Sequence, residues 1–192
     1  VKEWANKFGI AICGSFIAKD KGHYYNRGFF ISPTAEHYYD KRHLFRMGEE
    51  SNYFDAGDKR LIVEHKGFKI CLLICYDLRF PVWSRNVNNE YDLLIYSANW
   101  PIPRINVWDI LLKARAIENM AYVCGVNRLG KDGMNLTYNG RSTFVDPKGE
   151  PKIVMESGKE QIETIEISKQ EIDTLREKFP AWKDADNFEI KI

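Results

Sequence analysis

An unbroken apolar run, ICLLICY at residues 70–76, precedes a short polar turn, DLR. Apolar residues that follow one another without alternation predict a strand covered on both faces, in the middle of a sheet. Cys75 ends this strand at a point where the chain turns, which is a suitable position for a nucleophile. Free cysteine is also among the most buried residue types, so Cys75 fits equally well as a small core residue.

Two further apolar runs flank the clearest helical pattern of the chain. Residues 92–97 and 121–127 predict buried strands, and the first leads into a polar corner at Asn99 and Trp100. Between them, apolar residues at helical spacing predict a helix over 106–119 with Asn106 as its N-cap. Strands that alternate with helices favour an α/β fold with a mixed sheet.

The rest of the chain has the patterns of hairpins and shorter helices. The predicted strands are residues 10–18, 24–32, 37–39, 61–64, 68–74, 141–145, 152–156 and 161–167. The predicted helices are residues 1–8, 81–88 and 168–179, the last with a capping box of Ser168 and Glu171, and residues 45–59 and 129–138 predict loops. We expect two sheets packed face to face under outer helices, in a single domain 1–192 with a C-terminal arm at about 180–192.

Composition and charge exclude several classes of function. The 192 residues are 44% hydrophobic, which is enough for a full core. Lys and Arg total 28 against 27 for Asp and Glu, so the net charge of +1 indicates neither nucleic acid nor an anionic membrane as a partner. No apolar run approaches the roughly 20 residues of a membrane span, and the first residues lack the layout of a signal peptide, so we expect a cytoplasmic protein.

The four cysteines, Cys13, Cys71, Cys75 and Cys124, lie in strand-like segments rather than in CxxC pairs. This arrangement predicts reduced thiols rather than a disulfide framework or a zinc site. Cys71 and Cys75 would share one face of a strand but lie about 13 Å apart, too far to hold one metal ion.

A thiol nucleophile needs a base or a positive field, and the oxyanion formed on attack needs donors already in place. The chain offers Lys41 in YYDKRHLF and Glu50 in MGEES. A loop lysine or glutamate is most often a solvated surface charge, so neither residue alone is distinctive.

The combination of motifs is distinctive. It comprises DKRHLF at 40–45, ES at 50–51, AGD at 56–58, ICYDLRFP at 74–81, SANWP at 97–101, KARAIEN at 113–119, GRST at 140–143 and PKGE at 147–150. In this order and spacing the chain resembles the nitrilase (carbon–nitrogen hydrolase) superfamily, and within it the omega-amidase branch.

The resemblance implies a four-layer α-β-β-α sandwich and a Glu-Lys-Cys catalytic set. It implies hydrolysis of the terminal amide of small dicarboxylate monoamides, such as 2-oxoglutaramate and 2-oxosuccinamate, to acid and ammonia without a metal or organic cofactor. By position, Cys75 would be the nucleophile that forms a thioester, Lys41 would stabilise the oxyanion, and Glu50 would be the supporting glutamate. The backbone N–H of Tyr76 would be the second oxyanion donor.

One departure concerns the general base. In the family this glutamate lies on the first strand, upstream of the helix in which our chain begins, and Glu3 belongs to that helix. We therefore expect an N-terminally incomplete enzyme that lacks the first strand of the sandwich. Two alternatives stay open: another amidase or carbamoylase of the superfamily, and a non-catalytic homologue that serves as a scaffold or in dimerisation.

Other side chains have two interpretations each. Arg79 suits a substrate carboxylate, but it could also pair with Asp77 or Glu118. Trp100 could line the pocket or simply pack against neighbouring prolines, and His43 is expected to be structural because the Glu-Lys-Cys mechanism needs no histidine.

The helices next to the nucleophile carry more apolar residues than one sheet face requires. We therefore expect a homodimer with Trp83 or Trp108 as a buried anchor of the interface, as is usual in the family it resembles. The alternative is that these tryptophans complete the core of the monomer.

Overall fold

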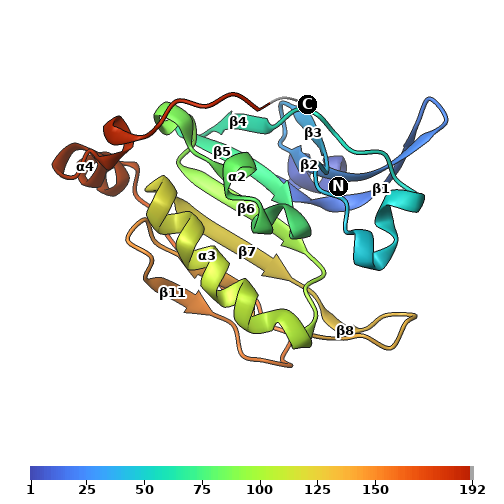
Figure 1. Ribbon diagram of the computed structural model, residues 1–192. Coiled ribbons are helices and arrows are strands. Elements are labelled where there is room, and N and C mark those ends of the chain that lie inside the picture. Colours follow the sequence, from blue (N-terminus) through green and yellow to red (C-terminus); the bar gives the residue numbers. More distant parts are fainter. Residues whose placement is uncertain (191–192) are drawn as a thin grey trace.

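A six-stranded mixed sheet lies at the centre of the molecule (Figure 1). The structure is a computed structural model, and it describes residues 1–190. In spatial order the strands are β11 (Pro151–Val154), β10 (Thr143–Val145), β7 (Tyr122–Asn127), β6 (Leu93–Ala98), β5 (Phe68–Ile74) and β4 (Leu61–His65). Strands β5, β6 and β7 run parallel, and the outer three are antiparallel to their neighbours. The three apolar runs are thus confirmed as the central strands.

Each face of this sheet buries a separate hydrophobic cluster. On one face α2 (Pro81–Ser84) and α3 (Ile105–Asn119) cover a cluster that includes Leu73 and Leu94, and α3 runs alongside β7 in Figure 1. On the other face lies a three-stranded antiparallel sheet of β1 (Ile12–Asp20), β2 (His23–Ile31) and β3 (Glu36–Asp40). There Phe30 packs in one cluster with Leu72 and Ile95.

The order of helices, sheet and sheet is that of the expected α-β-β-α sandwich. The short α1 (Lys2–Phe8) precedes β1 and contacts the smaller sheet through an ion pair of Lys2 with Glu36. At the other end, α4 (Lys169–Lys178) begins as expected, because the Ser168 hydroxyl accepts a hydrogen bond from the Glu171 N–H. The end of the predicted arm, residues 191–192, lies outside the described residues.

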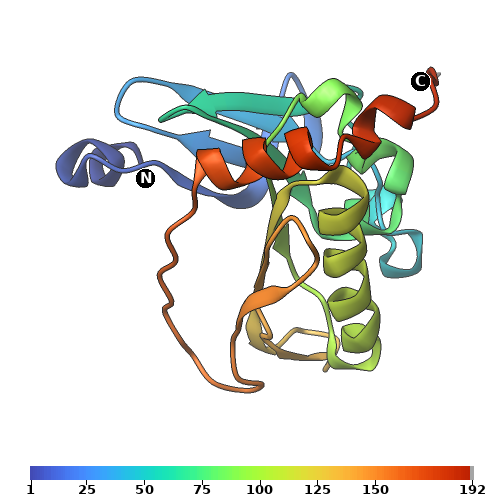
Figure 2. The same ribbon diagram turned by 90° about the vertical axis from the view of Figure 1, so that its left-hand side faces the viewer.

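Two predicted elements are wrong. Residues 161–167 form no strand but an irregular segment that loops away from the sheet before α4 (Figure 2). Ile165 and Ile167 pack on the core while Ile162 is 94% exposed, so the apolar residues at the end of this segment reflect packing rather than strand pairing. The predicted helix 81–88 stops at Ser84, because the Asn86 side chain bonds to both backbone groups of Tyr91 and competes with helical hydrogen bonds.

Other predicted boundaries also differ. Residues 129–138 form most of a hairpin, β8 (Leu129–Lys131) and β9 (Thr137–Asn139), because Asp132 accepts the N–H groups of Met134 and Leu136 and closes the turn. Short 3-10 turns occupy Arg46–Gly48 and Glu50–Asn52 within the predicted loop 45–59. Helix α3 begins at Ile105 rather than after Asn106, since a 3-10 turn, Ile102–Arg104, leads directly into it.

The two tryptophans expected at a dimer interface lie inside the monomer. Trp83 is 5% exposed and Trp108 is 0% exposed, both in the cluster beneath α2 and α3. Their indole N–H groups donate to Tyr39 and to the backbone of Arg141. The prediction that either one anchors an interface is therefore wrong. Among residues 1–190, no helix is both long enough and apolar enough to span a membrane.

Candidate active site

The carboxyl ends of the parallel strands bring distant parts of the chain together at one edge of the sheet. Ile74 of β5 is in register with Ser97 of β6, and Ser97 with Val126 of β7. Ligands of parallel sheets bind outside such ends. Here a cavity of about 480 Å³ opens. Its walls include all six residues predicted for the site: Lys41, Glu50, Cys75, Tyr76, Arg79 and Trp100.

Cys75 follows β5 directly and begins a 3-10 turn, Cys75–Arg79. Its φ of 44° is a left-handed conformation that residues other than glycine adopt rarely and at a cost. The thiol donates to the carbonyl oxygen of Asn99, with Sγ 3.7 Å from that oxygen. Burial raises the pKa of the Cys75 thiol, and the ammonium of Lys41 opposes this rise. The thiol therefore needs a proton acceptor in order to attack near neutral pH.

Lys41 and Glu50 form a buried ion pair in the cavity wall. Lys41 Nζ lies 2.6 Å from Glu50 Oε2, and Lys41 is only 3% exposed. The carboxylate also accepts hydrogen bonds from Asn26 Nδ2 and from the N–H of Phe45. Burial raises the pKa of Glu50, but Lys41 and these donors outweigh it and hold the pKa below its ordinary value. Glu50 therefore stays ionised and fixes the ammonium in place.

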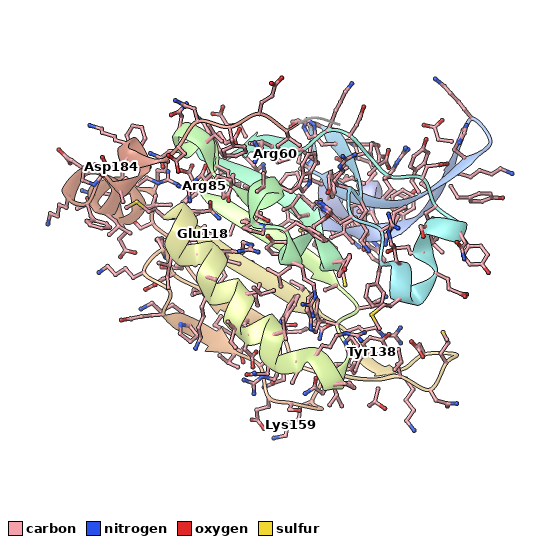
Figure 3. All side chains as sticks on the ribbon, viewed as in Figure 1. Arg60, Arg85, Glu118, Tyr138, Lys159 and Asp184 are labelled. Carbon is pink, nitrogen blue, oxygen red and sulfur yellow. The ribbon has the colours of Figure 1, made fainter. Side chains whose placement is uncertain are left out.

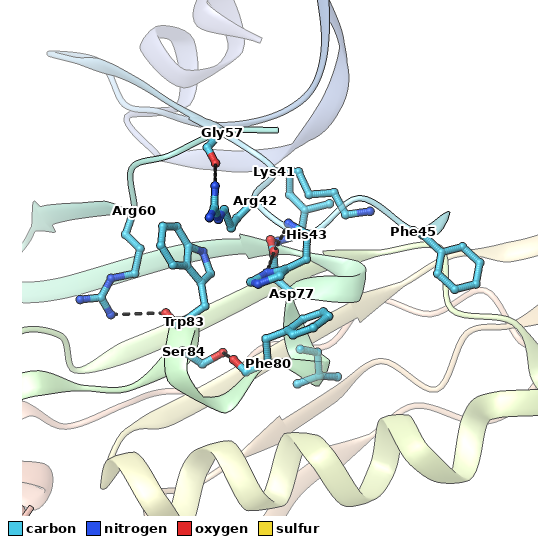
Figure 4. A network of polar contacts seen from close by, with 12 residues as sticks. Lys41, Arg42, His43, Phe45, Gly57, Arg60, Asp77, Phe80, Trp83 and Ser84 are labelled. Carbon is cyan, nitrogen blue, oxygen red and sulfur yellow. Dashed lines mark hydrogen bonds and ion pairs between the residues drawn. The ribbon is translucent and has the colours of Figure 1, made fainter. Parts of the chain in front are cut away.

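The backbone at Lys41 is held from both sides. Its N–H donates to the carbonyl of Asn26, and its carbonyl accepts from the N–H of Gly57 at 3.0 Å. Arg42 reaches the Gly57 carbonyl as well (Figure 4). A Cβ at Gly57 would lie 2.1 Å from the carbonyl oxygen of Asp40, so this close approach requires glycine.

Asp77, which the sequence analysis did not single out for the site, is fully buried within the Cys75–Arg79 turn. Its carboxylate accepts four hydrogen bonds, from the Tyr39 hydroxyl, from the N–H of Ile74, and from the N–H and the ring of His43. The His43 ring stacks on Phe80 with the ring centroids 3.7 Å apart. His43 lies outside the cavity lining, so the structure agrees with the structural role expected for it.

Arg79 lies in the cavity wall, with its guanidinium over the ring of Trp100 at 5.5 Å from the centroid. The alternative pairings with Asp77 and Glu118 are both wrong, because Asp77 binds other donors and Glu118 pairs with Arg115. Trp100 lines the cavity, as one of its two interpretations predicted, and it is also part of the hydrophobic core.

Comparison with known proteins identifies the family of this chain. The family model for carbon-nitrogen hydrolases matches residues 1–177. The chain belongs to the carbon–nitrogen hydrolase family. It is 48% identical to the Omega-amidase YafV of Escherichia coli (strain K12), over 97% of this chain and 73% of that protein. It is 36% identical to the 2-oxoglutaramate amidase of Bacillus subtilis (strain 168), over 96% of this chain and 72% of that protein.

A solved structure agrees with the fold of this carbon–nitrogen hydrolase. A CN-hydrolase superfamily protein from Xanthomonas campestris, described with an arsenic adduct in its active site, superposes with a TM-score of 0.96. The two are 41% identical, and the match covers 99% of this chain and 74% of that chain. The expected resemblance to the superfamily and to its omega-amidases is therefore confirmed.

The far wall of the hydrolase cavity comes from the β8–β9 hairpin, which the sequence analysis missed. Tyr138 lies in this hairpin beyond the end of the central sheet (Figure 3), and its hydroxyl donates to Asp132 at 2.7 Å. Asn127, at the end of β7, fixes the opposite corner by bonding to both backbone groups of Trp100. The only sequence signals for these residues were their positions near strand ends.

Proposed function

We propose that this carbon–nitrogen hydrolase releases ammonia from the terminal amide of short dicarboxylate monoamides, such as 2-oxoglutaramate and 2-oxosuccinamate. The observation that carries the proposal is one cavity that holds the thiol of Cys75, the ammonium of Lys41 and the guanidinium of Arg79. These groups suit a nucleophile, an oxyanion donor and a partner for the distal carboxylate. The names of the two amidase relatives support the same substrate class.

In the proposed reaction the Cys75 thiolate attacks the amide carbon, and the carbonyl π electrons move to oxygen. Lys41 Nζ and the N–H of Tyr76 stabilise this oxyanion. The intermediate collapses by breaking the C–N bond, and the protonated nitrogen leaves as ammonia. Water then attacks the Cys75 thioester, releases the acid and returns the thiol.

Glu50 is a poor candidate for the base that takes the thiol proton. Its carboxylate is fixed by Lys41 and two further donors, and its pKa is lowered, so it binds a proton weakly. We assign it the supporting role and assign the proton transfer to the general-base glutamate that the family resemblance implies.

Arg79 is proposed to bind the substrate carboxylate through two parallel N–H donors. No carboxylate within residues 1–190 forms an ion pair with it, and the Trp100 ring supports one face of the guanidinium. A cavity of about 480 Å³ leaves room for a small acyclic substrate. We expect substrates to need a carboxylate at the end opposite the amide.

A substrate panel tests the proposal. Ammonia release is measured with 2-oxoglutaramate, N-carbamoyl amino acids, simple nitriles and a neutral amide of matched length. Changing Arg79 to Ala should lower kcat/KM for 2-oxoglutaramate by about 100-fold and leave the neutral amide nearly unchanged, because a charged hydrogen-bond partner is lost. The matched control, Arg141→Ala, removes an arginine that pairs with Asp109 outside the cavity. Faster turnover of carbamoyl compounds or nitriles would contradict the substrate class.

The identity of the nucleophile is tested by alkylation. Burial raises the pKa of Cys71 and Cys124 to about 12, whereas at Cys75 the Lys41 ammonium counteracts burial. Cys13 is exposed but lies outside the cavity. Iodoacetamide should therefore modify Cys75 before the other cysteines, and activity should be lost at the rate at which Cys75 is modified. Full activity of a Cys75→Ala variant would contradict the assignment.

We further propose a homodimer and a cytoplasmic, reducing location, where the Cys75 thiol stays unoxidised. Because Trp83 and Trp108 are buried in the monomer, they do not support the dimer. Its support comes from apolar residues that are more than half exposed on α2 and α3, namely Val82, Ile110 and Ile117. Light scattering at micromolar concentration should give twice the monomer mass, and Ile110→Ser should lower it. A monomer mass for the unchanged protein would contradict the proposal.

A further inference from the structure

Asp77 joins the two segments that carry the reacting groups, although it does not line the cavity. We infer that Asp77 is a positioning residue of the hydrolysis, which holds the Lys41 loop in a fixed place relative to the Cys75 turn. The inference rests on the proposed function, in which Lys41 stabilises the oxyanion.

One carboxylate oxygen of Asp77 holds the end of strand β5. Oδ2 accepts the N–H of Ile74 at 3.0 Å, and Ile74 is the last residue before Cys75. The same oxygen accepts the hydroxyl of Tyr39 at 2.7 Å, near the end of β3 and two residues before Lys41. A single atom thus connects the nucleophile turn with the strand that leads to the lysine.

The second oxygen holds the chain beyond the lysine. Oδ1 accepts the backbone N–H of His43 at 3.0 Å and faces His43 Nδ1 at 2.8 Å (Figure 4). Tyr39 and His43 stand two residues to either side of Lys41, so Asp77 fixes the chain before and after it. An oxyanion donor must lie within about 3 Å of the developing charge, and a loop held at both sides meets this requirement.

The connection between the Cys75 turn and the Lys41 loop depends on the two acceptor oxygens of the Asp77 carboxylate. The Tyr39 hydroxyl donates to Asp77 and itself accepts from Trp83 Nε1 and from the N–H of Arg42. Asparagine has the same shape, but its amide nitrogen would face donors that Asp77 satisfies. The Asp77→Asn change therefore loosens one side of this connection without opening a cavity.

The charge of Asp77 has the opposite effect on the nucleophile. Burial is the main cause that raises the pKa of Cys75, and Asp77 adds a smaller rise. A variant that lacks this charge should form the Cys75 thiolate at least as readily as the unchanged protein. If turnover falls while the thiol of Cys75 reacts as fast as before, the nucleophile is intact. The loss of turnover then comes from a loss of positioning.

The test uses full-length Asp77→Asn, with Asp92→Asn as the matched control. Asp92 is also buried and also accepts a β5 N–H, that of Lys69, but at the strand end remote from the cavity. For Asp77→Asn we expect kcat for 2-oxoglutaramate to fall by about 30-fold or more with KM nearly unchanged, because the change acts in the transition state. The alkylation rate of Cys75 in Asp77→Asn should be equal to or higher than that of the unchanged protein. In Asp92→Asn, kcat and the alkylation rate should both stay unchanged.

A kcat in folded Asp77→Asn equal to that of the unchanged protein would overturn the inference, as would an alkylation rate that falls in parallel with kcat. Tyr39→Phe removes one of the four donors to Asp77, together with the acceptor for Trp83 Nε1 and for the Arg42 N–H, and it should lose kcat in the same direction even if Asp77→Asn does not fold. A crystal structure of either variant adds a readout independent of substrate: Lys41 Nζ should leave its position beside Glu50, and an unmoved lysine would contradict the inference. Absence of turnover in the unchanged protein would instead refute the proposed function.

Discussion

Replacing Lys41 with methionine should abolish turnover. The change keeps the apolar stem of a side chain that is nearly fully buried and removes only the ammonium. Loss of one preorganised oxyanion donor lowers kcat by about 100 to 1,000-fold. Lys41 is also the main group that counteracts the rise in the Cys75 pKa, and each further unit of pKa leaves about tenfold less thiolate at neutral pH. The two effects together predict a loss of about 1,000-fold or more.

The same change should destabilise the fold. Glu50 would keep the hydrogen bonds from Asn26 and Phe45 but lose its counter-charge, and an unpaired buried charge costs about 3 to 5 kcal/mol. The two remaining donors place the expected loss in the free energy of unfolding at the lower end of that range. A second change, Glu50→Gln, removes the unpaired charge, so the double variant should regain stability while staying inactive.

Ammonia release gives kcat, and urea unfolding gives the free energy of unfolding for each variant. The control is Lys159→Met, which breaks an exposed ion pair with Glu156 and should cost less than about 1 kcal/mol with normal activity. The reasoning is refuted if folded Lys41→Met retains more than about a tenth of the activity, or if the double variant regains turnover.

Three further changes have defined outcomes. Gly57→Ala places a Cβ 2.1 Å from the Asp40 carbonyl oxygen, so it should displace the Lys41 loop and lower kcat about tenfold or more in the ammonia assay. Gly125→Ala places a Cβ 2.6 Å from the Trp108 ring and should lower the free energy of unfolding by about 1 to 3 kcal/mol with unchanged KM. Burial raises the pKa of Asp92, but its hydrogen bonds lower it below the ordinary 3.8, so this carboxylate stabilises the fold above that pH and loses its contribution as the pH falls further. The difference in melting temperature between pH 3 and pH 7 should therefore be smaller in Asp92→Asn than in the unchanged protein.

Much of the candidate site could be predicted because its residues lie where regular patterns end. Cys75 follows an unbroken apolar run, and the corner at Trp100 follows another, so both strand ends were visible in the sequence. The pairing of parallel strands then brings these ends to one edge. Lys41 and Glu50 came from the order of motifs, since nothing in their local sequence separates a buried loop charge from a solvated one.

The residues that were missed owe their roles to distant partners. Asp77 looks like a polar turn residue, and its burial follows from contacts with Tyr39, 38 positions away. Asn86 and Asn127 act in the same way, since their side chains satisfy backbone groups that no local pattern identifies. Residues 161–167 show the converse error. Their apolar residues predict a strand, but in the structure Ile165 and Ile167 pack on the core from an irregular segment.

The edge of the sheet that forms the cavity has features that oppose folding. It buries the Lys41–Glu50 pair and the Asp77 carboxylate, and it holds Cys75 at a positive φ. Replacing a buried ion pair by apolar residues of similar size is often neutral or stabilising, and a strained φ costs about 1 to 3 kcal/mol. Neither feature is needed to join β5, β6 and β7, whose apolar faces already pack on both sides. Stability is therefore lost here in return for a fixed distance between a thiol and an ammonium. Replacing the Lys41–Glu50 pair by apolar residues and measuring the free energy of unfolding would show how much stability the pair costs.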